Sequence, residues 1–258
     1  MTQSTYLRNQ DANWVKGTAY PAAPTVYITL HTADPALTGA NELAFNARIA
    51  VSVFGAITTV GNTREMPVNE TITFTNAPST GTAPYWGAWD SLTGGNFLGG
   101  GIFVDDTGTP DPITFSITES VVINEGTIRF AYAIDVFSIY FVDAKLNWLA
   151  GTAMPTAPTN IYAIAGFNLT MTTGTEAVLP RELVSWGSII TIGAYKRIRN
   201  SVDLVFDSLT EPPLSFNSLR FYDAITAGNL LFIGRGKQKN YTVGQQPSWL
   251  TTRINVDF

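Results

Sequence analysis

The sequence predicts an all-β protein built of two tandem antiparallel β-sandwich domains of the jelly-roll type, each preceded by a short helix. Charged residues make up only 14% of the 258 residues, whereas Gly, Pro and aromatic residues are plentiful, which favours short strands joined by turns. Several stretches also alternate between apolar and polar residues, as half-buried strands do. Finally, one pattern of residues occurs twice along the chain, which predicts a tandem duplication.

The chain begins with a predicted helix. Between Ser4 and Gly17 the helical spacing places Leu7, Trp14 and Val15 on one face, and a glycine follows as a natural end. The same design returns 134 positions later, where Trp148 and its neighbours replace Trp14 and its neighbours. We therefore expect a second short helix at the start of a second copy.

A strand and a polar loop follow each helix. The first strand, Val26 to Thr32, ends before Asp34-Pro35, and Ile161 to Ala165 is its counterpart. Each loop then contains an acid and a base in the same order, which we interpret as two loop ion pairs rather than the remnant of a catalytic or metal site. The four residues of these expected pairs are Glu42, Arg48, Glu176 and Arg181.

A hairpin is expected near the centre of each copy. An apolar and aromatic run ends at Asp, a turn closes at Asn six residues later, and a second apolar run follows. Because this spacing is kept in both copies, the loop length and the strand register are expected to be the same. The structural turn residues are Asp90 and Asn96 in the first copy, and Asp223 and Asn229 in the second.

Further strands complete each copy, and they set the expected domain boundaries. The first copy ends in strands at Pro112 to Ile117 and Thr127 to Ile134, and the second ends in Trp249 to Phe258. Only three residues separate Ile134 from the second helix, which is too short for a flexible linker. We predict domains at residues 1–135 and 136–258.

Aromatic residues supply the expected core. Residues that recur at matched positions in both copies are expected to fill the two sandwich cores. The alternative is an exposed aromatic face that stacks on sugars, as in a carbohydrate-binding module, formed by Trp86, Trp89, Trp186, Trp249, Phe221 and Tyr222. The predicted core residues are Trp14, Trp148, Trp86, Trp89, Phe221 and Tyr222.

Composition excludes several chemistries. The formal net charge of −5 argues against a sequence-independent grip on nucleic acid, and the basic run Lys196 to Arg199 is interpreted as a solvated strand or loop edge. With no cysteine, a thiolate nucleophile or Cys-based zinc site is impossible. The one histidine, His31, is expected at an exposed or rim position, and the acidic loop Asp105 to Asp111 is interpreted as a turn. We predict no catalytic residue, cofactor or metal.

The N-terminus and the hydropathy pattern predict where the chain is made. The first residues lack the apolar region of a signal peptide, and no run of about 18 apolar residues occurs. We expect a soluble protein made in the cytoplasm of its host, with no membrane partner.

Particular motifs resemble those of a known family. These are Ser-Thr-Tyr-Leu-Arg-Asn from Ser4, Ala23-Pro24-Thr25-Val26-Tyr27, His31-Thr32-Ala33-Asp34-Pro35, and Gly87-Ala88-Trp89-Asp90 followed by Gly-Gly-Asn-Phe-Leu. The first copy resembles small bacteriophage virion proteins labelled minor tail or tail-fibre-like. The second copy departs from this pattern at Ala165-Gly166-Phe167-Asn168, which replaces the His-Thr-Ala-Asp-Pro stretch.

The resemblance implies a non-enzymatic virion structural protein that binds a repeating surface of the particle. Its partners would be other virion proteins, either the major capsid protein or tail proteins, and it is expected to form homo-oligomers. Two locations stay open, a capsid decoration or cement protein on the head and an accessory component of the tail. The alternative function is a host-glycan-binding adhesion module of a tail fibre.

Overall fold

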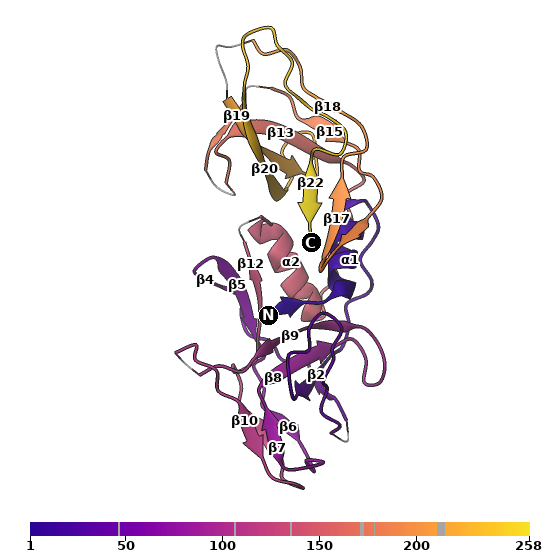
Figure 1. The fold of residues 1–258 in the computed structure, drawn as a ribbon, viewed down its shortest axis with the longest axis vertical. Helices are drawn as coiled ribbons and strands as arrows, with labels where there is room; N and C mark the ends of the chain where they lie inside the picture. The colour runs from indigo at the N-terminus through magenta and orange to yellow at the C-terminus, as the bar shows by residue number, and fades with distance from the viewer. Residues whose placement is uncertain (46, 106, 135, 171–172, 178, 211–214) are drawn as a thin grey trace. The chain divides into compact units, whose positions relative to one another are not determined.

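The computed structural model describes residues 1–45, 47–105, 107–134, 136–170, 173–177, 179–210 and 215–258 (Figure 1). The protein is all-β, with 9% of the chain helical. It contains two compact units. Unit 1 comprises Met1–Arg8, Pro21–Tyr132 and Asp143–Met154, and unit 2 comprises Asn9–Tyr20, Ala133–Val142 and Pro155–Phe258. The expected division into domains 1–135 and 136–258 stays a prediction.

Both expected helices are confirmed, and each contributes residues to both units. Helix α1 spans Thr5–Val15 and α2 spans Ile139–Leu149. The hydroxyl of Ser4 accepts a hydrogen bond from the Leu7 amide at 3.1 Å, and Ser138 caps α2 in the same way at Phe141. Gly17 follows α1 with a φ of 91°, a left-handed conformation that suits glycine after a helix. The boundary between the units falls after Arg8 in α1 and after Val142 in α2.

Unit 1 is organised around a five-stranded sheet with the order β1-β9-β8-β2-β3. At its centre, β2 pairs with β8 and β8 with β9, both antiparallel, so the three strands lie side by side (Figure 1). Three smaller sheets have the orders β10-β7, β11-β6 and β12-β5-β4. The strands are β1 Thr2–Gln3, β2 Val26–His31, β3 Ile49–Val51, β4 Thr58–Val60, β5 Thr63–Pro67, β6 Ile72–Phe74, β7 Gly81–Ala83, β8 Tyr85–Trp89, β9 Phe97–Ile102, β10 Ile113–Phe115, β11 Val121–Ile123 and β12 Arg129–Ala133.

Unit 2 has a comparable set of sheets. The largest has the order β14-β13-β19-β20, with β15 also paired to β13, and two smaller sheets have the orders β16-β17-β22 and β18-β21. Phe137 also pairs with Phe232 of β20 through an isolated antiparallel bridge. The strands are β13 Ile161–Phe167, β14 Thr175–Glu176, β15 Glu182–Val184, β16 Ile190–Ile192, β17 Tyr195–Arg199, β18 Leu204–Val205, β19 Ser215–Tyr222, β20 Leu230–Asn240, β21 Ser248–Trp249 and β22 Asn255–Asp257.

The prediction of two jelly-roll sandwiches is wrong. Among the described residues the strands form seven separate small sheets, and many strands are only two or three residues long. A jelly roll needs two broad sheets whose inner faces pack on each other. In the described residues each unit has one five-stranded sheet and otherwise only sheets of two or three strands, so neither unit has a second broad sheet to pack against the first. Alternation in the sequence predicted the strands but not how they would be grouped.

Candidate ligand-binding site

The predicted turn residues close both hairpins with the same set of bonds. The carboxylate of Asp90 accepts hydrogen bonds from the backbone amide and the side-chain amide of Asn96, at 2.6 and 2.7 Å. Asp223 accepts the corresponding bonds from Asn229 at 2.6 and 2.8 Å. In each hairpin the Asp amide also donates to the Asn carbonyl. These residues fix the loop, and both carboxylate oxygens of each Asp are engaged within the turn.

The structure brings Glu42 and Arg48 together. The guanidinium donates to both carboxylate oxygens of Glu42 at 3.0 Å, and also to the carbonyls of Ser91 and Gly94 in the hairpin loop. Its carbon lies 3.8 Å from the centre of the Trp89 ring, a cation–π contact. Arg48 therefore joins the polar loop to the hairpin, which is a structural role.

In unit 2 the corresponding acid, Glu176, pairs with Arg220 and not with the predicted Arg181. Glu176 accepts hydrogen bonds from Arg220 at 2.9 Å and from the Tyr222 hydroxyl at 2.8 Å, while Arg181 lies over the Tyr222 ring at 3.4 Å. Partial burial raises the pKa of Glu176, but the bonds from Arg220 and Tyr222 outweigh it and hold this pKa below its usual value. Arg181 also donates to the Ala224 carbonyl.

The predicted core aromatics divide into two groups. Four are buried, namely Trp14, Trp148, Trp86 and Phe221. The other two, Trp89 and Tyr222, are half-buried beneath the arginines described above. None of the six forms an open platform for a sugar.

The expected exposure of His31 is wrong, because its side chain is 0% exposed. Its ring nitrogens lie 2.8 Å from the Thr29 hydroxyl and 2.7 Å from the Ala40 carbonyl. Burial lowers the pKa of His31, which favours the neutral ring. The space comes from Gly87 on the neighbouring strand, where a Cβ would collide with His31 and Thr29. A histidine held in this way is not available as a general base.

The acidic loop is a turn, as predicted. The Asp105 carboxylate accepts hydrogen bonds from the amides of Thr107 and Thr109 and from the Thr107 hydroxyl. These bonds lower the pKa of Asp105, and the bond from the Thr107 hydroxyl has the largest effect. Asp106 lies outside the described residues. Within the described part of the chain, no three His, Asp or Glu side chains lie close enough together to hold a metal ion.

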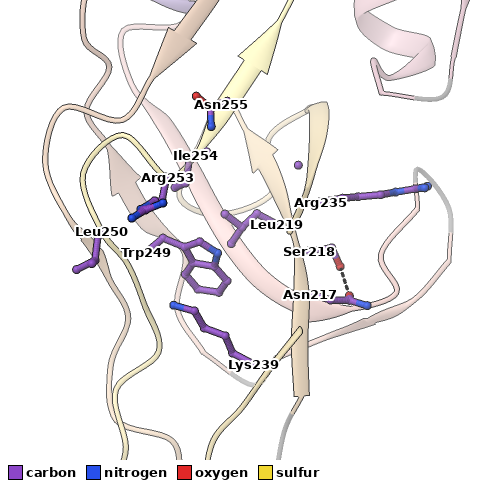
Figure 2. A pocket seen from close by; sticks show the side chains of 11 residues that line it. Asn217, Ser218, Leu219, Arg235, Lys239, Trp249, Leu250, Arg253, Ile254 and Asn255 are labelled. Carbon is purple, nitrogen blue, oxygen red and sulfur yellow. Dashed lines mark hydrogen bonds between the residues drawn. The ribbon is translucent and has the colours of Figure 1, made fainter. Parts of the chain in front are cut away.

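A pocket of about 440 Å³ lies in unit 2 and is the best candidate site (Figure 2). Its walls come from β19, β20, β21 and β22 and from the turn between the last two strands. Figure 2 shows the indole of Trp249 between the side chains of Lys239 and Arg253. The lining residues are Asn217, Ser218, Leu219, Gly234, Arg235, Lys239, Trp249, Leu250, Arg253, Ile254 and Asn255.

Neighbouring residues hold the aromatic and polar groups of the pocket in place. Phe206 packs edge-on against Trp249, with the ring centres 5.6 Å apart. The Lys239 ammonium donates to the Ser248 carbonyl at 3.1 Å and lies 5.9 Å from the Trp249 ring centre. The side-chain oxygen of Asn255 accepts a bond from Arg199, part of the basic run predicted to be a solvated strand or loop edge. That run lies in strand β17, but β17 is the middle strand of the sheet β16-β17-β22 and none of the four residues is exposed, so the prediction of a solvated edge is wrong.

The pocket is positively charged although the chain is acidic. Among the described lining residues three are basic, Arg235, Lys239 and Arg253, and none is acidic. All three are exposed. The carboxylate of Asp257 is paired with Arg197, whereas that of Asp203 accepts two bonds from Thr251 and keeps its charge, outside the lining of the pocket. The local field therefore favours an anion.

A second pocket of about 380 Å³ adjoins the first. The two share Asn217, Ser218 and Arg235, and Asn168, Leu169 and Thr170 complete the second. In Figure 2 the Arg235 side chain extends away from Trp249. The two hollows thus lie next to each other, with the three shared residues between them.

Trp249 is one of the aromatics that the alternative interpretation places on a sugar-stacking face, but the cations around it were not predicted. Arg235 and Lys239 are separated by an even number of positions, and a strand period of two is the signal that could have placed both on one face. Arg253 gave no such signal, because its place beside Trp249 depends on the turn that follows β21.

Residues 2–119 match the model of a family described as Podophage GP4 fiber I protein gp80. The match covers less than half of the chain and lies within its first half. No curated protein matches the chain. The match supports a structural role in a phage particle and, more narrowly, in a fibre. It gives no support to the expected capsid decoration or cement role.

The family match also supports a place in the virion. In the described ranges, neither helix is long and apolar enough to span a membrane.

Proposed function

We propose that this chain is a non-enzymatic component of a phage tail fibre. The observation that carries the proposal is the match of residues 2–119 to a phage fibre protein family. The structure is compatible with a building block, because the conspicuous ion pairs and aromatic contacts brace loops and hairpins. The one histidine is buried between Thr29 and Ala40 and cannot reach a substrate.

Its partners are other virion proteins, in particular further fibre or tail proteins, and copies of itself. The tandem duplication, which we retain as a proposal, is supported by the matching turns at Asp90 and Asp223 and by the matching caps of the two helices. Two similar units in one chain raise the effective concentration of the second contact once the first has formed. Weak individual contacts then suffice to hold the chain on a repeating surface.

The test is to count and locate the chain in purified particles. Quantitative peptide counting against the major capsid protein should give a few to a few dozen copies per particle. Gold-labelled antibodies should bind to fibres and leave the head unlabelled. Hundreds of copies, or label spread over the head, would show that the chain decorates the capsid.

A second function, adhesion to host glycans, is favoured by the Trp249 pocket. Aromatic rings beside polar side chains are the usual means by which proteins hold sugars, and this pocket combines an indole with amides and cations. Purified protein should bind intact host cells and lose that binding after their surface polysaccharide is stripped. Equal binding to stripped cells would exclude glycan adhesion and leave the fibre role untouched.

A further inference from the structure

We infer that the groove of unit 2 formed by the Trp249 pocket and its neighbour binds an anionic saccharide, one whose sugar units bear carboxylate or phosphate groups. The inference rests on the proposed adhesion function and specifies its ligand. Three features carry it: an aromatic platform, a set of cations with no acid among the described lining residues, and a second hollow that shares three residues with the first.

Trp249 supplies the platform. Its ring is half-buried and is held from one side by Phe206, so one part of the indole is fixed in the wall while another part faces the pocket. A sugar ring has an apolar face of C–H groups that packs on an indole. The pocket volume of about 440 Å³ lies within the usual range for small-ligand sites, roughly 300 to 1,000 Å³.

The cations select the charge of the ligand. Lys239 and Arg253 flank the indole in Figure 2, and Arg235 lies where the two hollows meet. The Lys239 ammonium has three N–H donors, and the Ser248 carbonyl takes one of them. A guanidinium offers paired donors that match the two oxygens of a carboxylate or phosphate. A neutral glycan accepts hydrogen bonds from these groups but leaves their positive charges uncompensated.

The groove sets the length of the ligand. Asn217, Ser218 and Arg235 line both hollows, and in the proposed complex a saccharide seated on Trp249 extends past them toward Thr170. An anionic group on a second sugar unit would then lie near Arg235. We therefore expect oligosaccharides to bind more tightly than single sugars.

Binding is best measured by calorimetry on the full chain, with pairs of probes that differ only in charge. Trigalacturonic acid is compared with its methyl ester, and phosphorylated maltotriose with maltotriose. Both acidic probes should bind at least tenfold more tightly than their neutral partners, and raising the salt from 50 to 300 mM should weaken that binding several-fold. The stronger of the two acidic probes identifies the anionic group.

Variants then test the location. Trp249→Ala should weaken binding of the acidic probe at least tenfold, and Lys239→Gln and Arg253→Gln should each weaken it three- to tenfold. The matched controls lie outside the pocket. Tyr195→Ala removes an exposed aromatic ring, and Lys196→Gln removes a positive charge. Both controls should bind as the wild type does. The two charge variants change exposed side chains, so they remain informative if Trp249→Ala folds poorly.

Several outcomes would overturn the inference. Equal affinity for acidic and neutral probes would show that the charge of the ligand does not matter, and wild-type affinity in Lys239→Gln and Arg253→Gln would place the site elsewhere. Tighter binding of a short single-stranded oligonucleotide would point to nucleic acid instead. If the chain labels fibres and binds host cells but no acidic probe, this inference fails while the proposed function stands. If the chain binds the acidic probe but is absent from fibres, the inference stands while the fibre role fails.

Discussion

Arg48 lies over the indole of Trp89 with its guanidinium carbon 3.8 Å from the ring centre, and the same guanidinium holds Glu42 and two carbonyls of the hairpin loop. One side chain thus ties together the end of β8, the loop that follows it and a distant polar loop. Arg181 repeats the aromatic contact on Tyr222, at 3.4 Å. The two arginines brace their hairpins, and their removal has measurable consequences.

Replacing Arg48 with alanine should lower the free energy of unfolding by about 2 kcal/mol, because a cation–π contact is lost and two carbonyls lose their donor. Arg48→Lys should cost less, since the charge remains while the forked geometry is lost. Urea unfolding measures both. Arg129→Ala is the control: that arginine side chain is 56% exposed and lies 3.9 Å from Glu65, so a change below about 0.5 kcal/mol is expected. Equal effects at the two positions would contradict the bracing role.

The Asp–Asn turns give a second prediction. Asp90→Ala and Asp223→Ala should each lower the free energy of unfolding by about 1 kcal/mol, since each removes two hydrogen bonds at the protein surface. Asp111→Ala, at another exposed loop carboxylate, serves as the control and should change little. Chemical denaturation of the three variants makes the comparison. A loss at only one of the two turns would show that the hairpins are not equivalent in energy.

These turns also show how much of the fold local sequence can specify. Hairpins and helices depend on residues within about ten positions of one another, so the repeated Asp and Asn, the spacing of the apolar helix residues and the glycine after each helix were enough to predict them. The Glu42–Arg48 contact is likewise local. The partner of Glu176 is not, because Arg220 reaches it from β19, which pairs with β13 across the sheet.

The burial of His31 and the grouping of the strands needed information that no single segment contains. Along β2 the residues Tyr27, Thr29 and His31 form the more polar face, which favoured exposure. The face is covered because Thr29 stands opposite Gly87 on β8, where the absence of a side chain opens room for the imidazole. Cross-strand register decides this, as it decides which strands bring cations beside Trp249.

The buried histidine predicts a dependence of stability on pH. Its pKa is lowered in the folded protein, chiefly by burial, so the unfolded chain binds a proton that the folded chain resists. The contribution of His31 to the free energy of unfolding should therefore be fully present above about pH 6.5, the pKa of histidine in an unfolded chain. It should decrease as the pH falls from there toward the lower pKa of His31 in the folded protein. Unfolding curves at pH 7.5 and 5.5 measure this loss. His31→Gln should be less stable at pH 7.5 but should show a smaller change between the two pH values, and an unchanged pH dependence would rule out His31 as its source.

The last prediction concerns residues 143–154, which belong to unit 1 although they follow the expected domain boundary in the chain. Within that unit Trp148 donates its indole N–H to the Pro21 carbonyl at 2.9 Å, and Asp143 accepts two bonds of 2.6 Å from Arg64. Leu146 and Trp148 are buried, so a fragment without them would expose apolar surface and leave Arg64 without this acid.

We therefore expect a fragment of residues 1–154 to unfold cooperatively and to resist proteolysis better than a fragment of residues 1–135. Introducing Trp148→Ala into the longer fragment should remove most of that advantage, since it deletes a buried indole and its hydrogen bond, a loss of about 3 to 5 kcal/mol. Lys16→Ala, an exposed position in the same fragment, is the control and should have little effect. Equal stability of the two fragments would mean that residues 143–154 add nothing to unit 1, and that the boundary after residue 135 describes an independent folding unit.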